Sequence, residues 1–128
     1  VAAAMTWLMV ALGGALGSVG RFGLGQALAR YDAFPYGTLL ANVLGSLVIG
    51  CCAGLLSDDQ KYSSPGLFLM VGFCGGFTTF STFSLQALEL MEQQAWAKVG
   101  GYMLLSVALC LLGTWLGLLL GQALRKTG

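Results

Sequence analysis

Four long apolar stretches occupy most of this 128-residue chain. A helix needs about 20 residues to cross the ~30 Å hydrocarbon core of a bilayer, and each stretch is long enough. We expect spans at about residues 4–28, 36–56, 65–91 and 99–120. Charged residues make up 9% of the chain, whereas soluble domains carry about 25%. So few charges cannot cover a water-facing surface, so the sequence predicts one all-α integral membrane domain over residues 1–128.

The loops at residues 29–35, 57–64 and 92–98 are short and polar, and basic residues in such loops normally set the orientation. The six basic residues divide equally between the two sides: Lys61, Arg125 and Lys126 share the side of both termini, and Arg21, Arg30 and Lys98 share the other if Arg21 reaches toward its nearer interface. This balance predicts insertion in both directions and an antiparallel, dual-topology homodimer. The alternative is one fixed orientation, set by a lost N-terminal residue or by a partner.

Several function classes find little support in the composition. The chain has no His and only five carboxylates, and the adjacent Asp58 and Asp59 are typical of a solvated turn, so an enzyme is not expected. The chain has no basic cluster of the kind that binds nucleic acid. The cysteines form no CxxC motif and lie in apolar stretches, which favours inert thiols over a disulfide or a metal site.

The third stretch carries the run Gly75-Gly76-Phe77-Thr78-Thr79 near its middle. Paired glycines weaken a helix, and threonine hydroxyls compete for backbone groups, so we expect a helix broken at mid-membrane. Irregular backbone at that depth is tolerated only when it is buried in protein or lines a cavity. Freed carbonyls there can hold a cation. In an antiparallel dimer two midpoint breaks would meet; the alternative is a simple kink.

Polar and aromatic residues near this break suggest an ion path. Phe80 and Phe83 share a helix face, and a phenyl edge can face a small anion, although such a pair is commonly core or lipid contact. Asn42 lies in an apolar span, where it either bonds a neighbouring helix or donates to an anion. The fourth stretch has a polar residue at every fourth position, which forms either a polar track or helix-to-helix contacts: Tyr102, Ser106, Cys110 and Thr114.

Three segments together resemble the Fluc (CrcB-type) fluoride channel family, and the resemblance covers essentially the whole chain. These segments are Gly17-Ser-Val-Gly-Arg21-Phe22, Gly37-Thr-Leu-Leu-Ala-Asn42-Val-Leu-Gly45 and Gly75-Gly-Phe-Thr-Thr-Phe-Ser-Thr-Phe83. The resemblance implies a passive channel that exports fluoride across the bacterial plasma (inner) membrane. It further implies a dual-topology homodimer with two pores, and no enzymatic activity.

The resemblance also assigns roles to individual residues. It implies that Phe80 and Phe83 line each pore from the two subunits and that Asn42 donates to fluoride. The polar side of the pathway matches Ser81, Thr82, Tyr102, Ser106 and Thr114, with Cys110 standing where a hydroxyl is expected. Arg21 matches a basic residue near the aqueous vestibule. A structural Na⁺ on the dimer axis would be held by the backbone carbonyls of Gly75 and Thr78.

Two other classes remain open from the sequence. A small multidrug-type antiporter also has four spans and dual topology, but it needs a carboxylate within the membrane. The first span has none, and Glu89 lies near the end of the third. A structural or assembly subunit is the other alternative, and it leaves the mid-membrane polar residues without a use.

Overall fold

The structure, a computed structural model, describes residues 2–128, and every regular element in that range is helical. Three long helices are continuous: α1 (Ala2–Ala27), α2 (Tyr36–Leu55) and α7 (Trp96–Thr127). The third apolar stretch is a series of shorter pieces: α4 (Ser64–Gly66), the π-helix η2 (Leu67–Cys74), α5 (Gly75–Phe77) and α6 (Phe80–Glu92). Short helices η1 (Ala29–Tyr31) and α3 (Asp58–Lys61) lie in two of the loops.

Four helical regions are long and apolar enough to cross a membrane: Ala3–Ala27, Tyr36–Leu55, Ser64–Glu92 and Trp96–Thr127. The prediction of an all-α chain with four candidate spans is confirmed. The largest difference in length is in the fourth region, where α7 continues well beyond residue 120. Arg125 and Lys126 lie in its last turn, where positive charge favourably meets the negative end of the helix dipole.

Prolines mark two helix starts. Pro35 directly precedes α2, and Pro65 lies in the first turn of α4, where a missing amide hydrogen costs nothing. Ser63 is the N-cap of α4, and its side chain makes no cap bond to the helix. The hydroxyl of Ser63 instead donates to the carbonyl of Gln60, 2.5 Å away.

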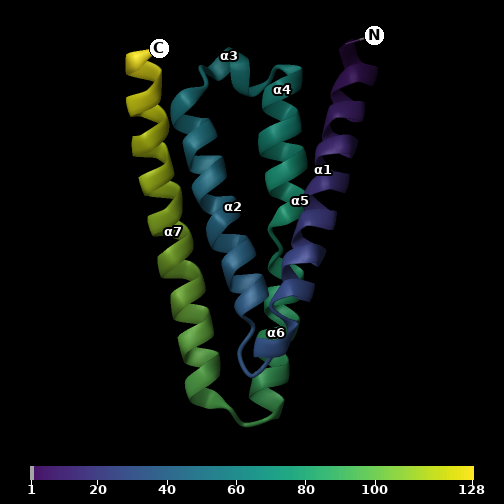
Figure 1. The fold of residues 1–128 in the computed structure, drawn as a ribbon, viewed down its shortest axis with the longest axis vertical. Helices are drawn as coiled ribbons and strands as arrows, with labels where there is room; N and C mark the ends of the chain where they lie inside the picture. The colour runs from purple at the N-terminus through teal and green to yellow at the C-terminus, as the bar shows by residue number, and fades with distance from the viewer. Residues whose placement is uncertain (1) are drawn as a thin grey trace.

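The long helices form two tightly packed pairs (Figure 1). In one pair α2 runs along α7, and in the other α1 runs along η2 and α5. Both chain termini and α3 lie at one end of the molecule, and the loop before α2 and the turn between α6 and α7 lie at the other. The two pairs also contact each other, because α2 touches both α1 and η2.

Glycines bring the backbones together within both pairs. At Gly117, an added Cβ would collide with the carbonyl of Leu47 and lie 2.8 Å from the amide nitrogen of Cys51. At Gly76, an added Cβ would lie 2.5 Å from the carbonyl oxygen of Gly14. Small residues at such contacts let helices associate in lipid, where van der Waals packing replaces the hydrophobic driving force.

Two threonines interrupt the third helical region. Thr78 (φ −90°, ψ 158°) and Thr79 (φ −152°, ψ 123°) are extended and separate α5 from α6. Within the run 75–79, where the sequence predicts a break, the two glycines are helical and only the two threonines are extended. The two glycines have different surroundings. Gly76 packs against α1, and Gly75 leaves open space beside the helix.

A small aromatic core closes the end of the molecule near the α6–α7 turn. Tyr102 of α7 is fully buried and packs with Ala87, Leu90 and Val99. The Tyr102 ring lies 5.0 Å from the ring of Phe83, measured between centroids. This core fixes α6 on α7 and so sets the position of the residues just after the extended pair.

The 57–64 loop, at the opposite end of the molecule, is polar and largely exposed. Ser57 caps α3, and its amide donates to the Gln60 side chain at 2.8 Å. Lys61 donates to Asp58 at 2.9 Å, and this hydrogen bond holds the pKa of the exposed Asp58 below its usual value. The loop is therefore a solvated turn.

Candidate functional site

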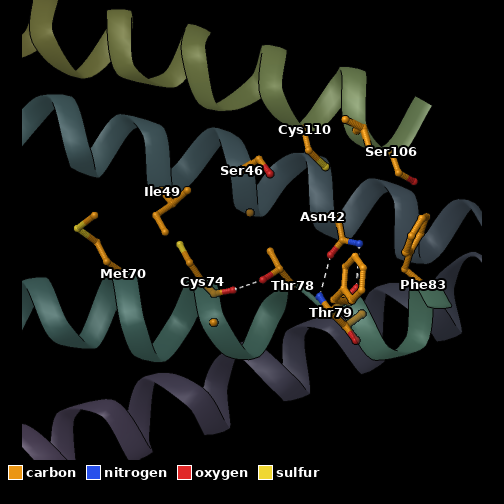
Figure 2. A pocket seen from close by; sticks show the side chains of 14 residues that line it. Asn42, Ser46, Ile49, Met70, Cys74, Thr78, Thr79, Phe83, Ser106 and Cys110 are labelled. Carbon is orange, nitrogen blue, oxygen red and sulfur yellow. Dashed lines mark hydrogen bonds between the residues drawn. The ribbon is translucent and has the colours of Figure 1, made fainter. Parts of the chain in front are cut away.

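A cavity of about 400 Å³ lies between the two helix pairs. Figure 2 shows its walls, which come from α2, from α7 and from the third helical region around its extended residues. We call it the Asn42 cavity, and it is lined by Asn42, Gly45, Ser46, Ile49, Met70, Cys74, Gly75, Thr78, Thr79, Phe80, Phe83, Ser106, Val107 and Cys110. None of these residues carries a formal charge, so the polar groups that the cavity offers are neutral dipoles, set among aromatic and aliphatic side chains.

Asn42 holds the extended backbone of the third region. Its Nδ2 donates to the carbonyl of Thr79 at 3.1 Å, and the amide of Thr79 donates back to Oδ1 at 2.8 Å. Figure 2 shows this reciprocal pair at the cavity wall. A carboxamide has two N–H donors, so one is used here and the second remains for another acceptor. Of the two uses that the sequence left open, the contact to a neighbouring helix is observed.

The hydrogen bonds around Thr79 also alter the helical ladder. In a continuous α-helix the amide of Thr79 would bond to the carbonyl of Gly75, and that of Thr82 to the carbonyl of Thr78. Here the Thr79 amide donates to Asn42, and the Thr82 amide donates to Oγ1 of Thr79 at 3.1 Å. The carbonyls of Gly75 and Thr78 therefore lose their usual donors, and both residues line the cavity.

Two neighbouring carbonyls are engaged. The carbonyl of Cys74 accepts from the amide of Thr78 at 3.0 Å and from its hydroxyl at 2.8 Å. The carbonyl of Gly76 accepts from Nε of Arg21 at 3.2 Å. The structure thus places Arg21 against the end of α5, where its positive charge meets the negative end of that short helical segment.

Phe80 and Phe83 follow the extended residues on α6. Their ring centroids are 5.5 Å apart. Phe80 is 79% exposed, whereas Phe83 is half-buried and packs on the aromatic core. The two rings are thus neighbours with different surroundings, one open to contact from outside the chain and one held within it.

Ser106 has the most unusual environment among the polar residues. Its side chain is only 7% exposed, and its hydroxyl has no hydrogen-bond partner among residues 2–128. Leaving a buried polar group unpaired costs about 1–3 kcal/mol. Ser106 is one of the residues that line the Asn42 cavity.

The remaining predicted site residues lie outside the cavity lining. Ser81 is exposed, with Oγ 3.4 Å from Oγ1 of Thr79, and Thr82 contributes its amide to that same hydroxyl. The hydroxyl of Tyr102 donates to Oε1 of Gln86 at 2.8 Å. Thr114 presents its backbone to α2, against Gly50. Of the polar stripe on α7, Ser106 and Cys110 line the cavity.

Sequence reasoning missed Thr79 as the partner of Asn42, together with Ser46 and Gln86. Ser46 lies one turn after Asn42 and Gln86 lies one turn after Phe83, so helical spacing would have found both. The role of Thr79 has a weaker signal, because N-cap threonines favour extended backbone before a helix. Its pairing with Asn42 joins residues 37 positions apart and leaves no trace in local spacing.

A second cavity, of about 350 Å³, lies near the loop before α2. Its lining includes Asp32, Thr38, Gln86, Glu89 and Lys98, so this end is charged where the Asn42 cavity is not. Lys98 donates to the carbonyl of Ala33 at 3.1 Å. Among residues 2–128, no group of three His, Cys, Asp or Glu side chains is placed to hold a metal ion.

A family model described as "CrcB-like protein, Camphor Resistance (CrcB)" matches residues 8–118. The chain belongs to the CrcB family. Curated relatives are similar over nearly their whole length, and each is named a fluoride-specific ion channel, FluC. The relative from Opitutus terrae is 47% identical over 116 residues, which is 87% of this chain and 88% of the relative.

Two further relatives carry the same name. The protein from Rhodospirillum rubrum is 48% identical over 118 residues, which cover 88% of this chain and 92% of that protein. The protein from Methylocella silvestris is 42% identical over 127 residues, which cover 95% of this chain and 97% of that protein. Members of the CrcB family that are similar to this chain are thus named as fluoride-specific ion channels.

Proposed function

We propose that this chain forms a fluoride-selective passive ion channel whose pathway passes through the Asn42 cavity. The observation that carries the proposal is the buried, unpaired hydroxyl of Ser106 in the wall of that cavity. It is a free hydrogen-bond donor in an uncharged site, as a small anion requires. The names of the CrcB relatives favour this function over a multidrug-type antiporter.

The donors available in the cavity suit fluoride. A strongly hydrated anion enters a narrow path only when protein groups replace its water, and it leaves only when no single group holds it too firmly. The second N–H of Asn42 and the hydroxyl of Ser106 are neutral donors, and the edges of Phe80 and Phe83 add weak positive potential. Ser81, Thr82, Tyr102, Cys110 and Thr114 would continue the polar side of the path.

The working unit in this proposal is an antiparallel homodimer with two pathways. The near-equal division of basic residues supports insertion in both orientations. Lys61, Arg125 and Lys126 lie toward one side and Arg30 and Lys98 toward the other, while Arg21 bonds to the Gly76 carbonyl. The exposure of Phe80, at 79%, leaves an aromatic surface beside the cavity for a second copy to cover. Each pathway would then use Phe80 and Phe83 from the two subunits, with Arg21 near the aqueous entrance.

A Na⁺ ion on the axis of this dimer would be held by the carbonyls of Gly75 and Thr78 from both subunits. The fit is supported by the hydrogen bonds of the extended segment, because the Thr79 and Thr82 amides that would occupy these carbonyls are directed elsewhere. Carbonyl oxygens are suitable ligands for a hard cation. The bound ion would supply positive charge that holds the two interrupted regions together.

The proposed location is the bacterial plasma membrane, and the proposed role is the exit of fluoride from the cytoplasm. HF crosses membranes and ionises in a neutral cytoplasm, where the anion would be trapped without a channel. A passive pathway suffices because the anion then moves down its own gradient. In this proposal the protein needs no carboxylate for proton coupling.

Efflux from proteoliposomes tests the function. Vesicles loaded with fluoride should empty after the protein is reconstituted, and vesicles loaded with chloride should not. Ser106→Ala should slow fluoride efflux by about tenfold, the effect of losing one hydrogen bond to a charged group. Equal chloride and fluoride efflux, or proton-coupled uptake of an organic cation, would contradict the proposal.

Labelling of a tagged C-terminus tests the topology separately. Intact cells and opened cells should show that half of the tags face each side, because the two orientations are expected in equal numbers. Adding two lysines to the 57–64 loop should shift the population toward one orientation. Labelling from one side only, in the unaltered chain, would refute dual topology.

A further inference from the structure

The reciprocal bond between Asn42 and Thr79 links the anion cavity to the carbonyls of the proposed cation site. We propose that Asn42 and Thr79 are positioning residues for that site: neither contacts the cation through its side chain, but together they keep the carbonyls of Gly75 and Thr78 out of the helix. This inference rests on the proposed Na⁺ site. It assigns Asn42 a task apart from donating to fluoride.

Asn42 accounts for the carbonyl of Gly75. The amide of Thr79 is the group that would bond to this carbonyl in a continuous helix, and it is held by Oδ1 of Asn42 at 2.8 Å. The return bond, from Nδ2 to the Thr79 carbonyl at 3.1 Å, fixes the orientation of the carboxamide. Without this side chain the Thr79 amide would be unpaired, and its acceptor in a continuous helix would be the Gly75 carbonyl.

Thr79 accounts for the carbonyl of Thr78. Its Oγ1 accepts from the amide of Thr82 at 3.1 Å and so caps the start of α6. That amide would otherwise bond to the carbonyl of Thr78. Thr79 therefore makes both bonds that free the carbonyls of Gly75 and Thr78. Its backbone amide bonds to Asn42, and its side chain bonds to the amide of Thr82.

The arrangement means that one carboxamide serves both ions. Oδ1 of Asn42 faces the backbone that shapes the cation site, while its second N–H stays available in the anion cavity. A variant at this position should therefore change cation affinity as well as fluoride flux. Ser106 lines the same cavity but bonds to neither Thr79 nor Thr82 among the described residues, so its effect should be confined to fluoride.

The test is the Na⁺ dependence of thermal stability for the purified full chain in detergent, with N-methylglucamine replacing Na⁺. A ligand that binds only the folded state raises its stability with concentration, so the midpoint of the rise reports cation affinity. Asn42→Ala should move this midpoint to about tenfold higher Na⁺, because recaptured carbonyls must be released again for each binding event. Ser106→Ala should keep the wild-type midpoint.

A second pair of variants makes the test independent of Asn42. Thr79→Val keeps the size and the extended preference of the residue but loses the hydroxyl, so the Na⁺ midpoint should again rise about tenfold. Thr79→Ser keeps the hydroxyl and should restore a midpoint near that of the wild type. If Asn42→Ala fails to fold, the contrast between these two variants decides the matter.

The outcomes separate this inference from the channel itself. Wild-type midpoints in both Asn42→Ala and Thr79→Val would overturn it while leaving the cation site in place. A wild-type protein with no Na⁺-dependent stabilisation would remove the cation site and this inference with it. Fluoride efflux measured on the same preparations tests the channel in either case.

Discussion

The helices of each pair pack backbone against backbone, whereas a cavity with polar groups in its walls lies between the two pairs. Within the pairs, glycines such as Gly54 and Gly117 bring backbones so close that an added methyl group meets a carbonyl. Between the pairs, the Asn42 cavity is wider and holds polar groups, one of which has no partner. The difference indicates that close backbone contact holds each pair together, whereas polar side chains are placed in the space between the pairs.

The extended residues lie where these two environments meet. On one side, Gly76 is pressed against Gly14 of α1. On the other side, Thr78 and Thr79 face the cavity. The close glycine contact anchors the end of α5, so the change to extended backbone is fixed in place and does not spread along the helix.

The largest predicted effect comes from adding bulk inside a pair. Gly117→Val should destabilise the protein by about 3 kcal/mol, because its side chain would collide with the backbone of α2 at Leu47 and Cys51. Thermal unfolding in detergent, followed by size-exclusion chromatography, measures the effect. If the variant kept wild-type stability and elution volume, the close packing of α2 on α7 would not be needed for folding.

A smaller effect on folding, with a clear effect on transport, is expected at the cavity. Phe80→Ile or Phe83→Ile replaces a ring edge by an aliphatic group of similar apolar character, so fluoride efflux should fall by about tenfold. The fold should be preserved, because Phe80 is largely exposed and isoleucine keeps an apolar side chain at the half-buried position of Phe83. Unchanged efflux in both variants would remove the rings from the pathway.

The sequence predicts the long helical spans better than it predicts the extended segment at the cavity. Hydropathy and length predicted the four candidate spans, and i, i+3 spacing placed Phe80 beside Phe83. For the third span the sequence named both the paired glycines and the threonines as weak points, without deciding between them. The structure shows that the threonines are extended while Gly75 and Gly76 stay helical. Helix propensity alone cannot reveal this, because packing against α1 decides the outcome.

The pairing of Asn42 with Thr79 could not be predicted, for a related reason. The sequence showed that a buried amide needs a partner, and that threonine hydroxyls compete for backbone groups. It did not show which peptide group would face Asn42, since that depends on how α2 lies against the third region. The positions of Tyr102 and Thr114 were uncertain for the same reason, because a periodic stripe on a long helix does not reveal where its neighbours end.

A third prediction tests the aromatic core that closes one end of the molecule. Tyr102→Phe keeps the ring contact with Phe83 but removes the hydrogen bond to Gln86, so stability should fall by about 1 kcal/mol. Tyr62→Phe is the matched control, because Tyr62 is 77% exposed and its hydroxyl faces solvent. Equal unfolding temperatures for the two variants would show that the bond to Gln86 contributes nothing measurable.

The smallest effect is expected at a glycine outside the close contacts. A Cβ added at Gly101 of α7 would meet no atom within 4 Å, so Gly101→Ala should gain helix propensity without a clash and raise stability by up to about 1 kcal/mol. The comparison with Gly117→Val, on the same helix, separates glycines that bring backbones together from glycines that do not. Unfolding midpoints of the two variants measure the contrast. A loss of stability in Gly101→Ala would mean that this face packs closely against a second copy of the chain, and the open glycine would then belong with the packed ones.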